Sequence, residues 1–158
     1  MALTPLVAAA LALTVPTAPA WQWPLRPQPA VVQRFEVGPS PWSPGHRGTD
    51  LAAAPGAAVR SPAAGVVRFA GVVAGKPVVS VDLGGGLTSS FEPVVGTLRP
   101  GTAVAAGQVV GRLSALPGHC APASCLHWGV RRDGAYVDPL ALLSGRRPIV
   151  LKPLGAVR

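Results

Sequence analysis

The sequence predicts an all-β fold, a compact antiparallel β-sandwich or barrel-like domain with little helix. Nineteen glycines and nineteen prolines interrupt the chain every few residues, and after the first twenty residues no window sustains the 3.6-residue apolar period of an amphipathic helix. Short runs rich in β-branched residues lie between these interruptions, each bounded by Gly or Pro. The predicted strands cover residues 58–60, 65–70, 77–83, 87–94, 102–104, 109–113 and 126–131.

The connections between these runs add to this prediction. Three glycines at 84–86 predict a hairpin; a phosphate-binding loop is the alternative, but it lacks the Lys-Ser/Thr pair and the following helix. The segments 55–59 and 100–104 look alike and are each followed by a Gly-containing strand, which indicates a duplicated hybrid motif. Similar units occur in lipoyl and biotinyl carrier domains, but neither Lys76 nor Lys152 has the sequence context of a carrier lysine.

Three segments are expected along the chain. Residues 1–20 combine an apolar run with the small-x-small sequence Ala18-Pro19-Ala20, which predicts a secretory signal peptide. The run is too short for a membrane span, although it lacks the usual basic residues before it, so a disordered or membrane-tethered apolar tail is the alternative. Residues 21–143 are expected to form one domain, and residues 144–158 a basic C-terminal tail.

The formal net charge of +8 bears on partners. All acidic and basic residues lie after residue 20, so an exported domain carries the whole charge, which favours anionic cell-envelope polymers. The basic residues are scattered, aromatic residues for base stacking are few, and no nucleic-acid motif is present, so we expect no nucleic-acid partner. No later apolar run is long enough for a transmembrane span, and we expect a secreted monomer.

Two histidines and one aspartate form the set with the clearest chemical meaning. His46 and Asp50 lie four residues apart in the run GHRGTD, and His127 lies much later in the run CLHWG. Two imidazoles and one carboxylate can bind one Zn²⁺ and leave a coordination position for water, as in catalytic zinc sites. The sequence therefore predicts one zinc ion held by His46, Asp50 and His127.

The order of these motifs resembles the lysostaphin/LytM-type zinc metalloendopeptidases, which are peptidoglycan hydrolase domains of bacterial cell walls. Besides the two histidine-containing runs, the resemblance rests on GVV at 65–67, GQVVG at 107–111 and VDP at 137–139. It extends over nearly all of the expected domain. The resemblance thus implies that residues 21–143 form a LytM-type zinc endopeptidase-like domain.

The resemblance also implies which residues act and how. It makes His46, Asp50 and His127 the metal ligands, and it implies hydrolysis of peptide bonds in peptidoglycan, with zinc activating a water molecule and polarising the carbonyl. Members of the family supply two further histidines that orient the water and stabilise the intermediate. Both are replaced here, one by Cys125 and the other by Pro93. Positioned acid–base groups contribute about 10²–10⁴ in rate, so both replacements bear on activity.

Glu92 is the candidate substitute for the replaced histidines. Pro93 follows it and must break the strand ladder locally. That break could turn the Glu92 carboxylate toward the metal as a base or as a fourth ligand. The alternative is a solvent-facing strand residue, and both interpretations stay open.

Cys120 and Cys125 are expected to form a disulfide, because they lie five residues apart in an exported protein. Side chains two apart on a strand share a face, so Cys125 must lie near whatever His127 binds. One alternative is a free Cys125 thiolate that acts as a fourth ligand and closes a structural zinc site. A nucleophilic Cys125 is the other, but the metal would then occupy its neighbour His127.

Two loop residues, His119 and Trp42, are further candidates. His119 directly precedes Cys120 and is a candidate substrate contact or substitute base, with an exposed loop histidine as the alternative. Trp42 lies in a Pro-rich loop and is a candidate substrate-binding residue. Trp128 alternates with His127 along a predicted strand and is expected in the core instead.

Two functions are compatible with these features. The first is an exported zinc metalloendopeptidase-like protein that hydrolyses peptide bonds in peptidoglycan, with weak or atypical activity. The second is a catalytically silent, zinc-holding domain that binds peptidoglycan or activates murein hydrolases. The three intact ligands favour the enzyme, whereas Pro93 and Cys125 favour the silent domain.

Overall fold

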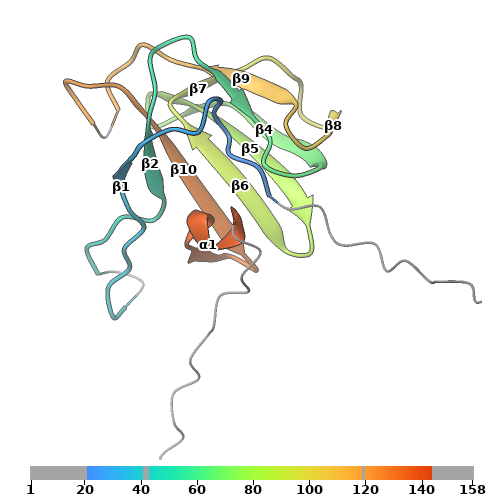
Figure 1. Cartoon of the computed structure of the whole chain (residues 1–158). Coiled ribbons are helices and arrows are strands. Elements are labelled where there is room, and N and C mark those ends of the chain that lie inside the picture. Colours follow the sequence, from blue (N-terminus) through green and yellow to red (C-terminus); the bar gives the residue numbers. More distant parts are fainter. Residues whose placement is uncertain (1–20, 41–42, 119, 144–158) are drawn as a thin grey trace, which may run out of the picture.

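The computed structural model describes residues 21–40, 43–118 and 120–143 (Figure 1). These residues form antiparallel β-structure with one short helix, so the predicted all-β class is confirmed. None of the helices in the described ranges is long and apolar enough to cross a membrane. The expected signal peptide at 1–20 and the expected basic tail at 144–158 lie outside the described residues.

The larger of two sheets has eight strands. They are β1 (Val31–Gln33), β2 (Thr49–Ala52), β4 (Gly65–Val73), β5 (Lys76–Gly84), β6 (Leu87–Glu92), β8 (Ala103–Val104), β10 (Cys125–Arg132) and β11 (Ala135–Val137). Their order is β1-β2-β10-β6-β5-β4-β8, and β11 pairs with β10. A strand from late in the chain, β10, therefore lies between two earlier strands, β2 and β6 (Figure 1).

The smaller sheet has three strands, β3 (Ala58–Arg60), β9 (Val109–Leu113) and β7 (Val94–Gly96), in the order β3-β9-β7. The helix α1 (Pro139–Leu143) contacts β10. The two similar segments of the sequence pair crosswise between the sheets, because β3 pairs with β9 and β4 pairs with β8. This exchange of partners agrees with the predicted duplicated motif.

Side chains along β10 point alternately into the core and to the opposite face of the sheet. Leu126, Trp128 and Val130 are fully buried, whereas His127 and Arg131 project from the opposite face. The Trp128 indole N–H donates a 2.8 Å hydrogen bond to Ser89 Oγ. The core position expected for Trp128 is therefore confirmed.

The strand prediction is accurate in the middle of the chain and incomplete at its ends. The hairpin predicted at 84–86 connects β5 to β6 and has positive φ at all three glycines. The run 87–94 is two strands, because Pro93 has no N–H for the ladder and the chain passes there from the larger sheet to the smaller one. The short strands β1, β2 and β11 were not predicted; in β2, the buried polar residues Thr49 and Asp50 hide the apolar alternation.

Candidate metal centre

The candidate metal centre forms where β2 and β10 lie side by side. In their antiparallel register His127 lies directly opposite Asp50. Residues directly opposite each other project from the same face of a sheet, so the carboxylate and the imidazole meet. Asp50 is fully buried, and the side chain of His127 is 16% exposed.

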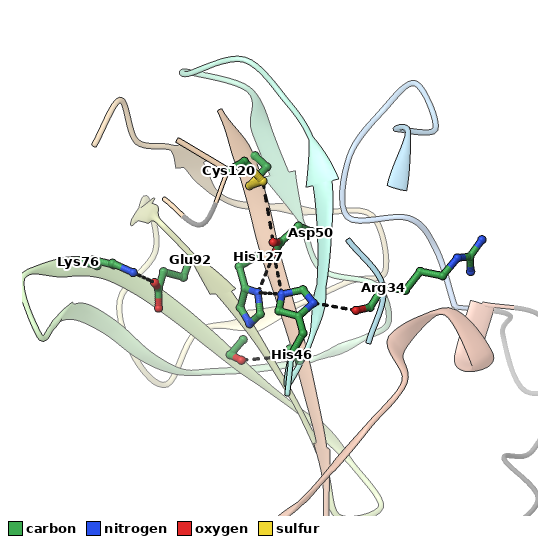
Figure 2. A network of polar contacts seen from close by, with 10 residues as sticks. Arg34, His46, Asp50, Lys76, Glu92, Cys120 and His127 are labelled. Carbon is green, nitrogen blue, oxygen red and sulfur yellow. Dashed lines mark hydrogen bonds and ion pairs between the residues drawn. A yellow bond between two sulfur atoms is a disulfide. The ribbon is translucent and has the colours of Figure 1, made fainter. Parts of the chain in front are cut away.

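His46 reaches this point from the loop before β2. Its backbone forms a bridge with Glu36, in which the His46 N–H donates to the Glu36 carbonyl at 2.7 Å and the Glu36 N–H donates back at 2.9 Å. This bridge fixes the backbone of His46 beside the sheet. Its imidazole points toward Asp50 and His127, as Figure 2 shows.

Three potential ligand atoms, one from each side chain, face one another. His127 Nδ1 lies 2.8 Å from Asp50 Oδ1, and His46 Nε2 lies 3.1 Å from each of these two atoms. Ligand atoms at about 2.0–2.1 Å from a tetrahedral zinc ion are about 3.3 Å from one another. The three atoms are therefore spaced nearly as zinc ligands are.

The hydrogen-bond partner of His46 leaves the ring nitrogen that faces Asp50 able to bind a cation. His46 Nδ1 lies 2.9 Å from the carbonyl oxygen of Arg34, and because that oxygen only accepts, Nδ1 is assigned the hydrogen. Nε2 is then the ring nitrogen that can offer a lone pair on the side of the buried Asp50 carboxylate. Facing lone pairs in a buried setting call for a cation between them, and a backbone carbonyl is a usual partner of a zinc-bound histidine.

Gly48 leaves the space that the His127 ring occupies. A Cβ at position 48 would lie 2.6 Å from His127 Cε1 and 2.7 Å from both His127 Nε2 and the backbone oxygen of Trp128. Any larger residue must therefore displace the imidazole or the strand. The sequence places Gly48 within the first histidine motif, but it does not show this close approach.

Glu92 lies at the end of β6, directly opposite His127 and on the same face of the sheet. Its carboxylate accepts a 2.7 Å hydrogen bond from Lys76 Nζ (Figure 2). Glu92 belongs to neither group of metal-capable side chains in the described part of the chain. The structure therefore places Glu92 beside the centre but does not bring it in as a fourth ligand.

A disulfide joins Cys120 to Cys125 at the start of β10. Cys125 is buried, and Cys120 Sγ lies 3.9 Å from Asp50 Oδ2. The alternatives in which Cys125 is a thiolate ligand or a nucleophile need a free sulfur, and neither cysteine is free here. The disulfide instead fixes the loop before β10 against the Asp50 carboxylate.

A groove of about 640 Å³ runs along the same face of the larger sheet. His127 and Glu92 line it where β10 and β6 face each other, and Arg131 lines it four residues further along β10. The hydroxyl residues Thr88 and Ser90 line it along β6. An extended chain lying in this groove therefore reaches the candidate metal centre.

Residues 44–139, which contain the three potential ligands, match the peptidase family M23. This segment is more than half of the chain. The chain belongs to peptidase family M23. Members of this family are in general zinc-dependent metallopeptidases, so the resemblance seen in the sequence is confirmed.

Some known proteins are similar to this M23 domain in sequence and others in fold. The uncharacterized protein Rv2891 of Mycobacterium tuberculosis (strain ATCC 25618 / H37Rv) is 51% identical over 138 residues, which are 85% of this chain and 55% of that protein. The chain thus spans about half the length of the curated relatives that it matches. Csd3 of Helicobacter pylori has a TM-score of 0.66 and 26% identity over 80% of this chain and 35% of that one. A zinc-containing peptidase from Vibrio cholerae has a TM-score of 0.64 and 21% identity over 77% of this chain and 39% of that one.

The sequence predicted part of this M23 site and missed part of it. The partners that it missed are the Arg34 carbonyl, Lys76 and Gly48. A backbone carbonyl carries no residue-type signal, and the pairing of Lys76 with Glu92 depends on the register of β5 and β6. The remaining candidates, His119 and Trp42, lie outside the described residues.

Proposed function

We propose that this M23 domain is an exported zinc metallopeptidase that hydrolyses peptide bonds in peptidoglycan. The observation that supports this most is the set of three ligand atoms from His46, Asp50 and His127, which lie within 3.1 Å of one another beside an open groove. Three protein ligands leave the fourth position of a tetrahedral ion to water. The chemistry that bound Zn²⁺ supplies is activation of this water and polarisation of a carbonyl.

The chain's own residues prepare this site. The Arg34 carbonyl fixes the tautomer of His46, which leaves Nε2 as the ligand atom. Glu92 lies opposite His127 on the groove face and is the proposed proton acceptor. Lys76 holds the Glu92 carboxylate at that end of the groove through its 2.7 Å ion pair.

An extracytoplasmic location forms part of the proposal. It is supported by the predicted signal peptide at 1–20, by the disulfide between Cys120 and Cys125, which is typical of oxidising compartments, and by membership of family M23. The net charge of +8 favours contact with anionic polymers of the cell envelope. Peptidoglycan peptides are the proposed substrate, and the domain is proposed to act as a monomer.

The second candidate function is a silent domain that holds zinc and binds peptidoglycan or activates a murein hydrolase. Two observations favour it. Cys125 is bound in a disulfide and so has no proton to transfer, and Pro93 is buried with its carbonyl accepting a 2.8 Å hydrogen bond from the Ser114 N–H. Neither residue can do the work of the histidine that the family resemblance implies at its position.

Digestion of purified peptidoglycan separates the two functions. We expect the zinc-loaded protein to release muropeptides that mass analysis identifies, and we expect neither His46→Ala nor chelator-treated protein to do so. Binding to insoluble peptidoglycan is measured in parallel by sedimentation. Wall binding by zinc-loaded protein with no metal-dependent product would reject the enzyme and support the silent domain.

A further inference from the structure

We infer that the groove takes an extended peptide that carries a carboxylate, and that Arg131 is the residue that selects it. The inference rests on the proposed function, in which the groove is the substrate site, and adds the chemical class of the substrate. Arg131 lies at the far side of the groove from the metal ligands, so it acts on specificity and does not take part in the reaction.

The position of Arg131 sets a distance. It is four residues from His127 on β10 and on the same face, so their Cα atoms are about 13 Å apart at about 3.3 Å per residue. An extended peptide lying along the strand covers that length with about four residues. A carboxylate bound at Arg131 therefore lies about four residues from the peptide bond presented to the metal centre.

Tyr136 holds the Arg131 side chain in one orientation. The two residues are directly opposite each other in the pairing of β10 with β11. Arg131 Cζ lies 4.6 Å from the centre of the Tyr136 ring, and Arg131 Nη2 donates a 2.5 Å hydrogen bond to the Tyr136 hydroxyl. Such stacking keeps the planar guanidinium ready for a two-pronged contact with a carboxylate.

The charge around Arg131 favours an anion. Arg131, unlike Arg68 and Lys76, takes part in no ion pair of the described residues. The groove lining holds Arg68 and Arg131 against one carboxylate, that of Glu92, which Lys76 already pairs. Arg68 contacts Asp82 at 3.4 Å, but these side chains are 68% and 43% exposed, so the pair is weak and easily screened. The carboxylates of Asp82 and of Asp133, which lies beside the groove residue Gly86, are also near this end of the groove. Arg131 is the groove cation there that forms no ion pair with them, so it can bind an anion.

The part of the groove between His127 and Arg131 has space and polar groups for a peptide backbone. Gly129 lies between His127 and Arg131 on the groove face and has no side chain to obstruct the path. A Cβ there would lie 2.9 Å from Ser90 Oγ. Ser90 donates a 3.3 Å hydrogen bond to the Gly129 carbonyl, and its hydroxyl and that of Thr88 line the path. These hydroxyls supply polar partners for the amides of an extended peptide.

Calorimetric titration of the zinc-loaded full chain tests the inference. The probes are alanine- and glycine-based heptapeptides with a single Glu near one end or the other, each with a Gln counterpart. We expect one Glu peptide to bind about tenfold more tightly than its Gln counterpart, with a smaller ratio at high salt. In Arg131→Gln we expect the Glu and Gln peptides to bind equally well, with the affinity for the Gln peptide unchanged. In Arg131→Lys we expect part of the preference for the Glu peptide to be kept.

The matched control is Arg112→Gln, on β9 of the smaller sheet, which is expected to keep the full ratio. Equal binding of Glu and Gln peptides by the unmodified chain, or an unchanged ratio in Arg131→Gln, would overturn the inference. Binding of inorganic polyphosphate through Arg131, with no preference for Glu over Gln peptides, would also overturn it, because the ligand would then be an anionic polymer.

Mass analysis of the same samples separates this inference from the proposed function. A preference for Glu peptides without hydrolysis contradicts only the enzyme. Hydrolysis of peptidoglycan without a preference for Glu peptides contradicts only the role of Arg131.

Discussion

His127 and Asp50 lie directly opposite each other on β10 and β2, with His127 Nδ1 2.8 Å from Asp50 Oδ1, although 77 positions separate them in the chain. The candidate metal centre is thus a product of strand register. A shift of one residue between the two strands would move one of these side chains to the other face of the sheet.

Removal of the metal should destabilise the protein, because ligands that bind only the folded state stabilise it. At free zinc of about 100 times the Kd this stabilisation is about 2.7 kcal/mol. We expect a chelator to lower the midpoint of urea unfolding of the unmodified chain. In Asp50→Asn, an amide replaces the buried carboxylate, and the chelator should have little effect.

Asp82→Asn is the matched control for this experiment, since Asp82 is a partly exposed residue on β5 outside the ligand set. It should keep one zinc per chain by elemental analysis and a full response to the chelator. Zinc at one per chain in Asp50→Asn would show that Asp50 is not a ligand.

Gly48→Ala should disrupt the site through the position of His127. The added Cβ would meet the imidazole at 2.6 Å and the Trp128 backbone oxygen at 2.7 Å, and overpacking of this kind costs about 1–3 kcal/mol. We expect lower stability and at least a tenfold loss of zinc affinity, measured with a competing chelator. Gly118→Ala, whose nearest new contact is at 3.5 Å, should change neither quantity; an unaffected Gly48→Ala would mean that the ring has room to move.

The disulfide should make both cysteines unreactive in the native protein. Thiol titration is expected to find no reactive thiol before reduction and two after it. The loop closed by the bridge is short, so replacing both cysteines by alanine should lower the free energy of unfolding by about 2 kcal/mol. Thiols that appear on chelation alone, without a reductant, would instead identify the cysteines as metal ligands.

Glu92→Gln should lower the activity strongly while it changes zinc binding and stability little. If Glu92 accepts a proton in the reaction, muropeptide release should fall by about 10²–10⁴ while zinc content stays the same. Loss of the ion pair with Lys76 should cost less than about 1 kcal/mol of stability, since both side chains are partly exposed. Glu36→Gln serves as the control, and equal activity of Glu92→Gln and the unmodified chain would make Glu92 a plain strand residue.

The sequence predicts the strands of the middle of the chain because their signals are local. The runs from 58 to 113 are rich in β-branched residues and are bounded by Gly or Pro, and the hairpin at 84–86 has the residues that positive φ requires. The strand β2 carries no such signal, because burial of Asp50 depends on partners brought from elsewhere in the chain. Pro93 was expected to break the ladder, but the sequence does not show that the chain changes sheets there.

Residue type predicts the potential ligands but not the groups that orient the side chains of the site. His46, Asp50 and His127 could be named from spacing and family resemblance, since few residue types bind zinc. The Arg34 carbonyl that orients His46 is a backbone group, and any residue at that position could supply it. The ion pair between Lys76 and Glu92 joins the ends of two strands and needs the register of the sheet to be known.

The position of β10 in the sheet has a consequence for biosynthesis. A ribosome makes this strand after every other long strand, yet the strand must insert between β2 and β6, which without it share no ladder. A nascent chain that ends before Cys125 contains His46 and Asp50 but lacks the third ligand atom. The three potential ligand atoms can therefore meet only once the late strand has docked between β2 and β6.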